Sequence, residues 1–331
     1  MQSKSLVSAL VLSALLAVPA LAEGEKSLSE FTKVEKRADV GEVVRCSIRT
    51  YAPPPPPKKR AMPGMGGMMG GGGKSKPFKR PEIVLISMIH MGEKGFFQAV
   101  NKELAKCDLV LYEEQGDSDL GGLSGKMISE LTGLAFQGTE IPFNKETWRS
   151  ADLSQDSLFR MLGMDVEQLK RMKKMMKNMG GFKMDKRMLE SNPMMKQMLP
   201  SREKIMAQLR TSGSSDKMAE GFGDMADVIL YQRNAIAIGE LTKASHESHK
   251  RVALIYGAAH MPGIEAYMTK TLHYKHTGTT WLDAVYGDEE VSKARAGQSQ
   301  TGDSESPNAP QPKVRPKKPA TKSGKKGEGW F

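Results

Sequence analysis

Residues 252–263 read Val-Ala-Leu-Ile-Tyr-Gly-Ala-Ala-His-Met-Pro-Gly, and this stretch decides the predicted fold. An apolar run of strand length ends on small residues, and His260 follows them. Such a run without polar alternation is typical of a strand buried on both faces of a parallel sheet. In open sheets of this kind, ligands bind beyond the carboxyl ends of the strands. The sequence therefore predicts that His260 lies at a ligand-binding edge.

A second stretch has the same design. Residues 81–92 read Pro-Glu-Ile-Val-Leu-Ile-Ser-Met-Ile-His-Met-Gly, so that His90 follows the apolar run, and apolar side chains at helical spacing come next. A third run, residues 108–114, ends in Glu113 and Glu114. We therefore expect an α/β fold with a mostly parallel central sheet and flanking helices, in which the strand ends bring these side chains together.

The rest of the chain shows clear changes of composition. Lys4, an apolar stretch and Ala20-Leu21-Ala22 indicate a secretory signal peptide, because the apolar stretch is too short to span a membrane. We expect an exported protein, periplasmic or secreted, without a transmembrane segment. The predicted organisation is a signal peptide at 1–22, an N-terminal strand segment at 23–52, a basic linker or loop rich in proline, glycine and methionine at 53–80, an α/β domain at 81–287 with a helical Met-rich insertion at about 155–215, and a disordered basic tail at 288–331.

The positive charge is concentrated outside the predicted domain. The net charge is +11, of which residues 53–80 contribute +7 and residues 291–331 contribute +6, leaving about −2 for everything else. A nucleic-acid enzyme should have a basic stripe on its folded surface, so the folded body is not expected to bind nucleic acid. The tail either keeps the protein soluble or contacts an acidic surface.

Two further features of the sequence concern the structure. Export makes Cys46 and Cys107 candidates for one disulfide, and the alternative is that Cys107 is a buried thiol. Residues 225–241 are predicted to form a helix that has four apolar residues on roughly one side, namely Val228, Ile229, Ile236 and Leu241.

The three strand ends suggest metal chemistry. His90, Glu113 and His260 offer two imidazoles and a carboxylate, which are the ligands that zinc and other divalent ions take in catalytic sites. Such a set with open coordination positions is suited to hydrolysis. The alternative is that each histidine only caps a strand and bonds to the backbone. The occurrence of two matched histidines with a carboxylate favours the metal site.

The same residues resemble a known family. His90 after an apolar strand, Glu113 closing a second strand, and Gly257-Ala-Ala-His260-Met-Pro-Gly are similar to the TraB/PrgY–Tiki superfamily, which includes GumN-like bacterial proteins. That group is more distantly related to the erythromycin-esterase and ChaN-like folds. Its hallmark is two Gly-x-x-His motifs, a glutamate between them, and an arginine on a helix before the second motif.

The match extends over roughly residues 83–285 and has one departure. The second motif is complete, whereas Ser87 stands at the glycine position of the first. Tyr231-Gln232-Arg233-Asn234 resembles the arginine-containing helix of the family, and residues 148–154 resemble a segment of some bacterial members.

The resemblance implies an exported, metal-dependent hydrolase of peptidase type that acts on a peptide or protein substrate. His90, His260 and Glu113 would hold a divalent ion (Mn, Co or Zn) that activates water, with Glu113 as general base if it is not a ligand. Arg233 would bind the substrate carboxylate or stabilise an oxyanion, and Asn234 and Glu114 would complete the substrate-binding set. The alternative for Arg233 is an ordinary salt bridge to Glu113 or Glu240.

Two other functions remain open. The first is a catalytically inactive TraB-type protein that binds a peptide or a signal. The second is a periplasmic metal-binding protein that holds a soft ion through methionine clusters, such as Met65, Met68 and Met69 or Met172, Met175, Met176 and Met179. Against the second, interleaved lysines repel a cation, and methionine also suits adaptable helical surfaces.

Overall fold

The structure is a computed structural model. It describes residues 31–55, 79–114, 119–120, 123–124, 129–130, 132–143, 145–161, 201–211, 227–296, 300 and 302–305, with a few positions between 163 and 174. The predicted signal peptide, most of the predicted linker, residues 175–200 of the Met-rich insertion and the end of the tail lie outside these residues.

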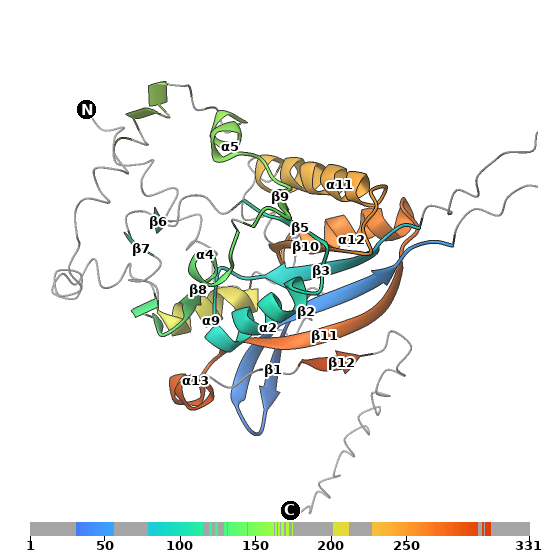
Figure 1. The fold of residues 1–331 in the computed structure, drawn as a ribbon. Helices are drawn as coiled ribbons and strands as arrows, with labels where there is room; N and C mark the ends of the chain where they lie inside the picture. Colours follow the sequence, from blue (N-terminus) through green and yellow to red (C-terminus); the bar gives the residue numbers. More distant parts are fainter. Residues whose placement is uncertain are drawn as a thin grey trace, which may run out of the picture.

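One sheet of eight strands forms the centre of the molecule (Figure 1), in the order β12-β11-β2-β3-β10-β5-β9, with β1 paired to β2. The strands are β1 (Thr32–Arg37), β2 (Gly41–Ala52), β3 (Glu82–Met88), β5 (Leu109–Tyr112), β9 (Trp148–Ser150), β10 (Arg251–Gly257), β11 (Lys275–Tyr286) and β12 (Asp303–Glu305). The short strands β4 (Met91–Gly92) and β8 (Ala135–Phe136) pair with each other, as do β6 (Asp119–Leu120) and β7 (Leu123–Ser124).

The expected parallel strands form one half of the sheet. β10 lies between β3 and β5, and β9 follows β5, all in parallel. Alternate residues of β10 face opposite cores: Leu254 and Tyr256 belong to one cluster, and Ala253 and Ile255 to the other. Burial on both faces explains why this strand is apolar at successive positions. The α/β class and the parallel central strands are confirmed.

The other half of the sheet is antiparallel. β2 is hydrogen-bonded to β3 on one side and to β11 on the other, with Ile48 opposite Ile86 and Cys46 opposite Leu282. The N-terminal segment, which was predicted to lie outside the α/β domain, is therefore part of the same sheet.

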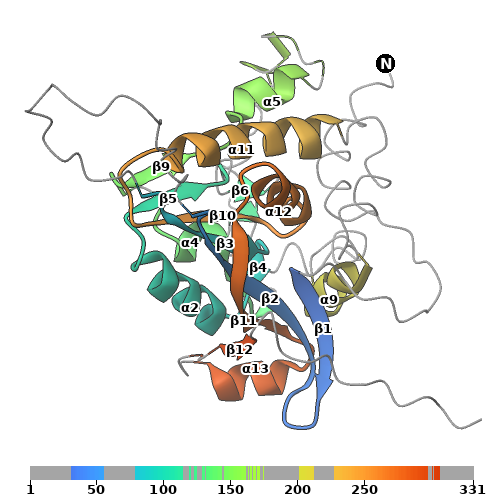
Figure 2. The ribbon, with the colours of Figure 1, turned by 90° about the vertical axis from the view of Figure 1, so that its right-hand side faces the viewer.

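Helices cover both faces of the sheet (Figure 2). The helices are α2 (Lys94–Leu104), α4 (Gln137–Glu140), α5 (Gln155–Met161), α9 (Arg202–Thr211), α11 (Arg233–Ala244), α12 (Met261–Lys270) and α13 (Glu289–Arg295). The apolar side chains of α11 and α12 pack on the face that holds Leu254, whereas α2 buries four apolar side chains on the opposite face, namely Phe96, Phe97, Val100 and Leu104. Helices α5 and α9 agree with the expected helical insertion at its two ends. No helix in the described ranges has the length and apolar character needed to cross a bilayer.

The helix predicted over 225–241 has a different register. Its first part is a π-helix, η2 (Asp227–Gln232), and α11 continues from it. The wider π-turn changes the angular phase of the residues that follow. The buried residues are therefore Leu230, Ala237 and Leu241, while the exposed fraction of Ile236 is 38%. The predicted apolar face was wrong at that position.

The predicted disordered tail begins with ordered structure. α13 starts after Asp288, whose side chain accepts a hydrogen bond from the Glu290 N–H and so caps the helix. Ser292 of this helix is buried. Its hydroxyl donates a hydrogen bond to Glu93 and accepts one from Arg202 of α9. β12 then pairs with β11. These polar contacts, which apolar periodicity does not reveal, keep the start of the tail on the domain.

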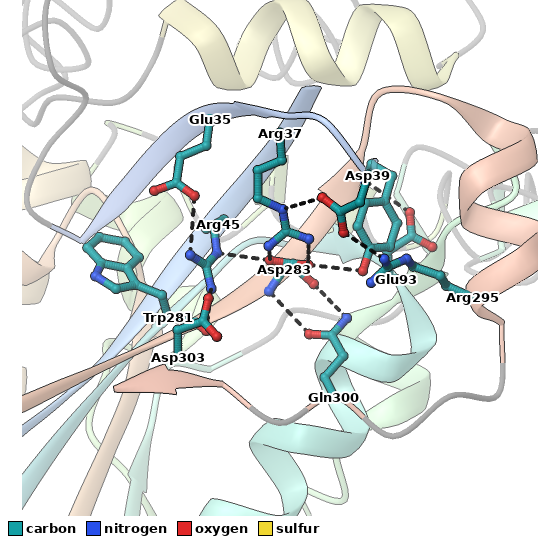
Figure 3. Close-up of polar contacts among 11 residues, drawn as sticks. Glu35, Arg37, Asp39, Arg45, Glu93, Trp281, Asp283, Arg295, Gln300 and Asp303 are labelled. Carbon is teal, nitrogen blue, oxygen red and sulfur yellow. Dashed lines mark hydrogen bonds and ion pairs between the residues drawn. The ribbon is translucent and has the colours of Figure 1, made fainter. Parts of the chain in front are cut away.

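A network of charged side chains, centred on the buried Arg45 and Asp283, joins the antiparallel strands (Figure 3). Asp283 of β11 accepts hydrogen bonds from both terminal nitrogens of Arg37, at 3.2 and 2.9 Å. It also forms an ion pair with Arg45 Nε at 2.9 Å. Arg45 also bonds Asp303 of β12 at 2.8 Å, and the Gln300 amide pairs with the backbone of Asp283. This network ties β1, β2, β11 and β12 together at the edge distant from β10.

Ser87, which stands where the family motif has glycine, has a structural role. It is buried, and its hydroxyl lies 2.9 Å from the carbonyl oxygens of Phe31 and Ser47 while accepting the Ser47 N–H at 3.0 Å. These hydrogen bonds therefore connect β3 to β2 and to Phe31, the residue that precedes β1.

Removing this hydroxyl should affect stability. We expect Ser87→Ala to lower the free energy of unfolding by about 1–3 kcal/mol, because buried polar groups lose a partner. Ser87→Gly should cost about 1 kcal/mol more, since glycine loses more backbone freedom on folding. Urea unfolding monitored by circular dichroism measures both. An unchanged midpoint in both variants would contradict this role.

The two cysteines are free thiols. Cys46 is buried in β2, and Cys107, which follows α2, is half-buried. Burial raises the pKa of Cys46 to about 12 and that of Cys107 to about 11. Of the alternatives left open by the sequence, the structure has the free thiol, although Cys107 is only half-buried.

Thiol labelling can test this state. Because the thiolate is the reactive form, we expect slow reaction with a disulfide reagent at pH 8 in the native protein, with Cys107 ahead of the more buried Cys46. Two thiols per chain should react rapidly after unfolding without reductant. The Cys46→Ser and Cys107→Ser variants identify each phase, and the absence of thiols in the unfolded chain would instead indicate a disulfide.

Candidate functional site

The predicted site residues follow the ends of three adjacent parallel strands. His90 comes two residues after β3, Glu113 directly after β5, and His260 three residues after β10. Register brings these ends to the same edge, since Gly257 pairs with Met88 and the Glu113 N–H donates to the Ile255 carbonyl at 3.0 Å. The sheet therefore places all three residues at one edge, beyond the ends of their strands.

Glu113 is a buried, ionised carboxylate. Its Oε1 accepts a hydrogen bond from Arg233 Nη2 at 2.6 Å, and its Oε2 accepts the Gly257 N–H at 2.6 Å. Burial by itself would raise the pKa of Glu113, but the charge of Arg233 and this backbone N–H outweigh it and lower the pKa to about 2. A Cβ atom at position 257 would come within 3.2 Å of Oε2, so the glycine leaves room for the carboxylate.

Asp152, which was not predicted as a site residue, holds the other side of Arg233. Arg233 Nε lies 2.9 Å from Asp152 Oδ1, and Nη2 lies 2.5 Å from Oδ2. The Asp152 side chain is 1% exposed and also accepts the N–H groups of Leu153 and Glu114. The available signal was its position two residues after the end of β9, within the segment 148–154.

Arg233 is thus held between two carboxylates. The salt bridge to Glu113, left open by the sequence, is present, while Glu240 pairs with Arg149 and Lys243 instead. Burial would lower the pKa of Arg233, but the hydrogen bond to Asp152 raises it. Among the bonds of Arg233 to described residues, none uses Nη1. That nitrogen is the part of the guanidinium left to meet a ligand.

His260 is buried and neutral. Its Nδ1 lies 2.8 Å from Asn234 Oδ1, and its ring packs edge-on against Tyr256 at a centroid distance of 4.9 Å. Burial lowers the pKa of His260 to about 4, although Glu113 opposes this effect. An amide oxygen only accepts, so this contact is a hydrogen bond in the tautomer with the proton on Nδ1, which leaves the lone pair of Nε2 free.

Asn234 and Glu114 were predicted to bind substrate. The side chain of Asn234 instead contacts His260 and Gly263, whereas Glu114 is exposed beside Asp152. Burial and the neighbouring Asp152 raise the pKa of Glu114.

His90 has an exposed side chain, and its carbonyl oxygen accepts the Gln137 N–H at 2.8 Å. It lies near enough to Glu113 and His260 for its charge to lower the pKa of both.

The donor set fits a divalent ion in its chemistry, although the ligands are not drawn tightly together. Among the described residues, no group of three His, Cys, Asp or Glu side chains is placed to hold a metal ion. The fit rests on His260, which is neutral, presents Nε2 and is supported at Nδ1, as a metal-ligating histidine usually is. The two buried carboxylates also exceed the single guanidinium by one negative charge, which favours a cation.

Other candidate places contribute nothing to this site. A cavity of about 320 Å³ between α2 and α13 is lined by none of the predicted site residues. The methionine clusters at 65–69 and 172–179 lie outside the residues whose side chains the structure describes.

Comparison with known proteins gives no identification. No family model matches the chain, and searches of curated proteins and of solved structures find no match. The TraB/Tiki resemblance therefore stays a prediction from the motifs.

The buried ion pair of Asp152 should contribute more to the free energy of unfolding than an exposed pair of the same kind. We expect Asp152→Asn to lower the free energy of unfolding by about 3 kcal/mol, because one partner of a buried pair is lost. The matched control is Glu247→Gln, since Glu247 binds Arg149 through two hydrogen bonds but both side chains are more than a third exposed. That change should cost less than about 1 kcal/mol. Equal effects in denaturant unfolding would contradict the structural role given to Asp152.

Proposed function

We propose that the protein is an exported metal-dependent hydrolase of peptidase type, which cleaves a peptide or protein substrate outside the cytoplasm. The observation that supports this proposal most is that four residues from separate parts of the chain lie near one another at the carboxyl edge of the parallel strands. They are His90, Glu113, Arg233 and His260. These are the residues that the TraB/Tiki resemblance marks as functional.

His90 and His260 are the residues proposed to hold the metal, with His260 binding through Nε2. A divalent manganese, cobalt or zinc ion there would act as a Lewis acid and lower the pKa of a water molecule. The exposed ring of His90 lies on the solvent side, and the buried ring of His260 is fixed by Asn234.

Glu113 is better suited to an electrostatic role than to proton transfer. A general base works best with a pKa near the working pH, whereas the pKa of Glu113 is about 2. Its two oxygens also already bind Arg233 and the Gly257 N–H. We therefore propose that Glu113 orients Arg233 and supplies negative charge beside the metal site, in place of the base or ligand role expected from the sequence.

Arg233 is proposed to contact the substrate through Nη1. With Nε and Nη2 fixed by carboxylates, the guanidinium cannot rotate, and the remaining N–H groups have a defined direction. A fixed donor suits a substrate carboxylate or a developing oxyanion, because no reorganisation is needed when charge forms. Exposed Glu114 is placed to contact a positively charged part of the same substrate.

A binding protein without catalysis is the second candidate. One observation favours it: Arg233 and the Gly257 N–H together satisfy both oxygens of Glu113, so the carboxylate needs no metal. In this case the edge would bind a peptide or signal and leave it intact. For either function, the basic tail is proposed as a contact for an acidic surface.

Metal content and hydrolysis together test the proposal. Protein starting at residue 23 would be incubated with manganese, cobalt or zinc, then desalted and examined for bound metal and for cleavage of a peptide library. We expect stoichiometric metal, and a loss of metal and of at least about 100-fold in kcat/KM for His90→Ala and His260→Ala. His246→Ala, which removes an exposed imidazole at the end of α11, is the matched control and should keep both.

Two outcomes would decide against the hydrolase. Metal binding that survives both site substitutions would place the ion elsewhere. Peptide binding without cleavage under every metal, lost in the His260→Ala variant, would support the binding protein.

A further inference from the structure

We infer that Asn234 is a positioning residue that sets the tautomer of His260, and that Gly263 exists to leave space for its amide. This inference deepens the proposed function, on which its relevance to hydrolysis rests. It goes beyond the motifs, which predicted substrate binding for Asn234.

The geometry defines which ring nitrogen is protonated. Asn234 Oδ1 lies 2.8 Å from His260 Nδ1, and this oxygen has no hydrogen to give. Nδ1 must therefore donate, and the proton is absent from Nε2. The bond made by one ring nitrogen determines what the other can do, so Asn234 keeps Nε2 ready to accept a proton or bind a metal.

Gly263 explains how the amide reaches the ring. A Cβ atom at position 263 would lie 2.8 Å from Asn234 Nδ2, so the Asn234 amide would have to shift to make room for it. Gly263 is the third residue of α12 and has no left-handed backbone conformation, so its φ angle does not require glycine. Glycine within a helix is destabilising relative to alanine. At this position it leaves the Asn234 amide undisturbed where α11 and α12 meet.

The position of Asn234 links the two halves of the site. Asn234 follows Arg233 directly in the first turn of α11, just after the π-helix ends. One residue reaches the carboxylates after β5 and β9, and its neighbour reaches the histidine after β10. The start of α11 therefore orients the guanidinium and the imidazole together.

The tautomer can be measured without any activity. Metal-free protein with ¹⁵N-labelled histidine would be examined by long-range ¹H–¹⁵N correlation at pH 7. We expect the Nδ1–H tautomer for His260 in the wild type, a mixture in Asn234→Ala, and recovery in Asn234→Asp, whose carboxylate also accepts from Nδ1. Gly263→Ala should displace the amide and give the mixture while keeping Asn234. Asn101→Ala, which removes an amide bound to the Glu140 carbonyl, is the matched control and should leave His260 unchanged.

Hydrolysis or metal affinity in the same variants gives the functional effect. Loss of such a supporting contact costs about 10–100-fold, so Asn234→Ala and Gly263→Ala should fall by this factor and Asn234→Asp should recover. An Nε2–H tautomer in the wild type, or an unchanged Nδ1–H tautomer in both Asn234→Ala and Gly263→Ala, would overturn the inference. If Asn234→Ala does not fold, Gly263→Ala gives the same comparison. Should the protein lack hydrolytic activity altogether, the tautomers still decide the inference, so the two proposals fail separately.

Discussion

The site depends on one buried guanidinium held between two carboxylates. Arg233 donates hydrogen bonds to Glu113 on one side and to Asp152 on the other. These two carboxylates follow the ends of the neighbouring strands β5 and β9. Removing such charges from water is costly, and the arrangement is stable only because each carboxylate has further donors in backbone N–H groups. Helix α11 is in this way fixed to the edge of the sheet by charge as well as by apolar contact.

This arrangement also determines the electrostatics around the histidines. A guanidinium beside His260 opposes protonation of the imidazole, and burial acts in the same direction. The nearby carboxylates oppose both effects but do not prevail. The result is an ionised glutamate and a neutral histidine at adjacent strand ends. Because the pKa of Glu113 is about 2 and that of His260 about 4, this pair of charge states holds at any pH above about 4.

The sequence predicted the features that depend on local pattern. Unbroken apolar runs indicated buried parallel strands, and His90, Glu113 and His260 were found where those strands end. Spacing alone could not reveal Asp152, because β9 is only three residues long and has no apolar periodicity. The spacing also predicted wrongly that Ile236 lies on the apolar face of its helix, because a π-turn shifts the helical phase without a local signal in the sequence. The role of Asn234 depends on a contact with Gly263 across two helices, which no single segment encodes.

The central position of β2 has a consequence for the order in which the fold can be completed. β2 is made early in synthesis, yet one of its hydrogen-bonded neighbours, β11, comes near the end of the described chain. Pairings between residues so distant in sequence form slowly, because a long loop must close first. Until β11 is synthesised, β2 keeps one edge unpaired, and an open edge can pair with another chain. A nascent chain of this protein would therefore stay incompletely folded through most of its translation, a state in which chaperones can engage it.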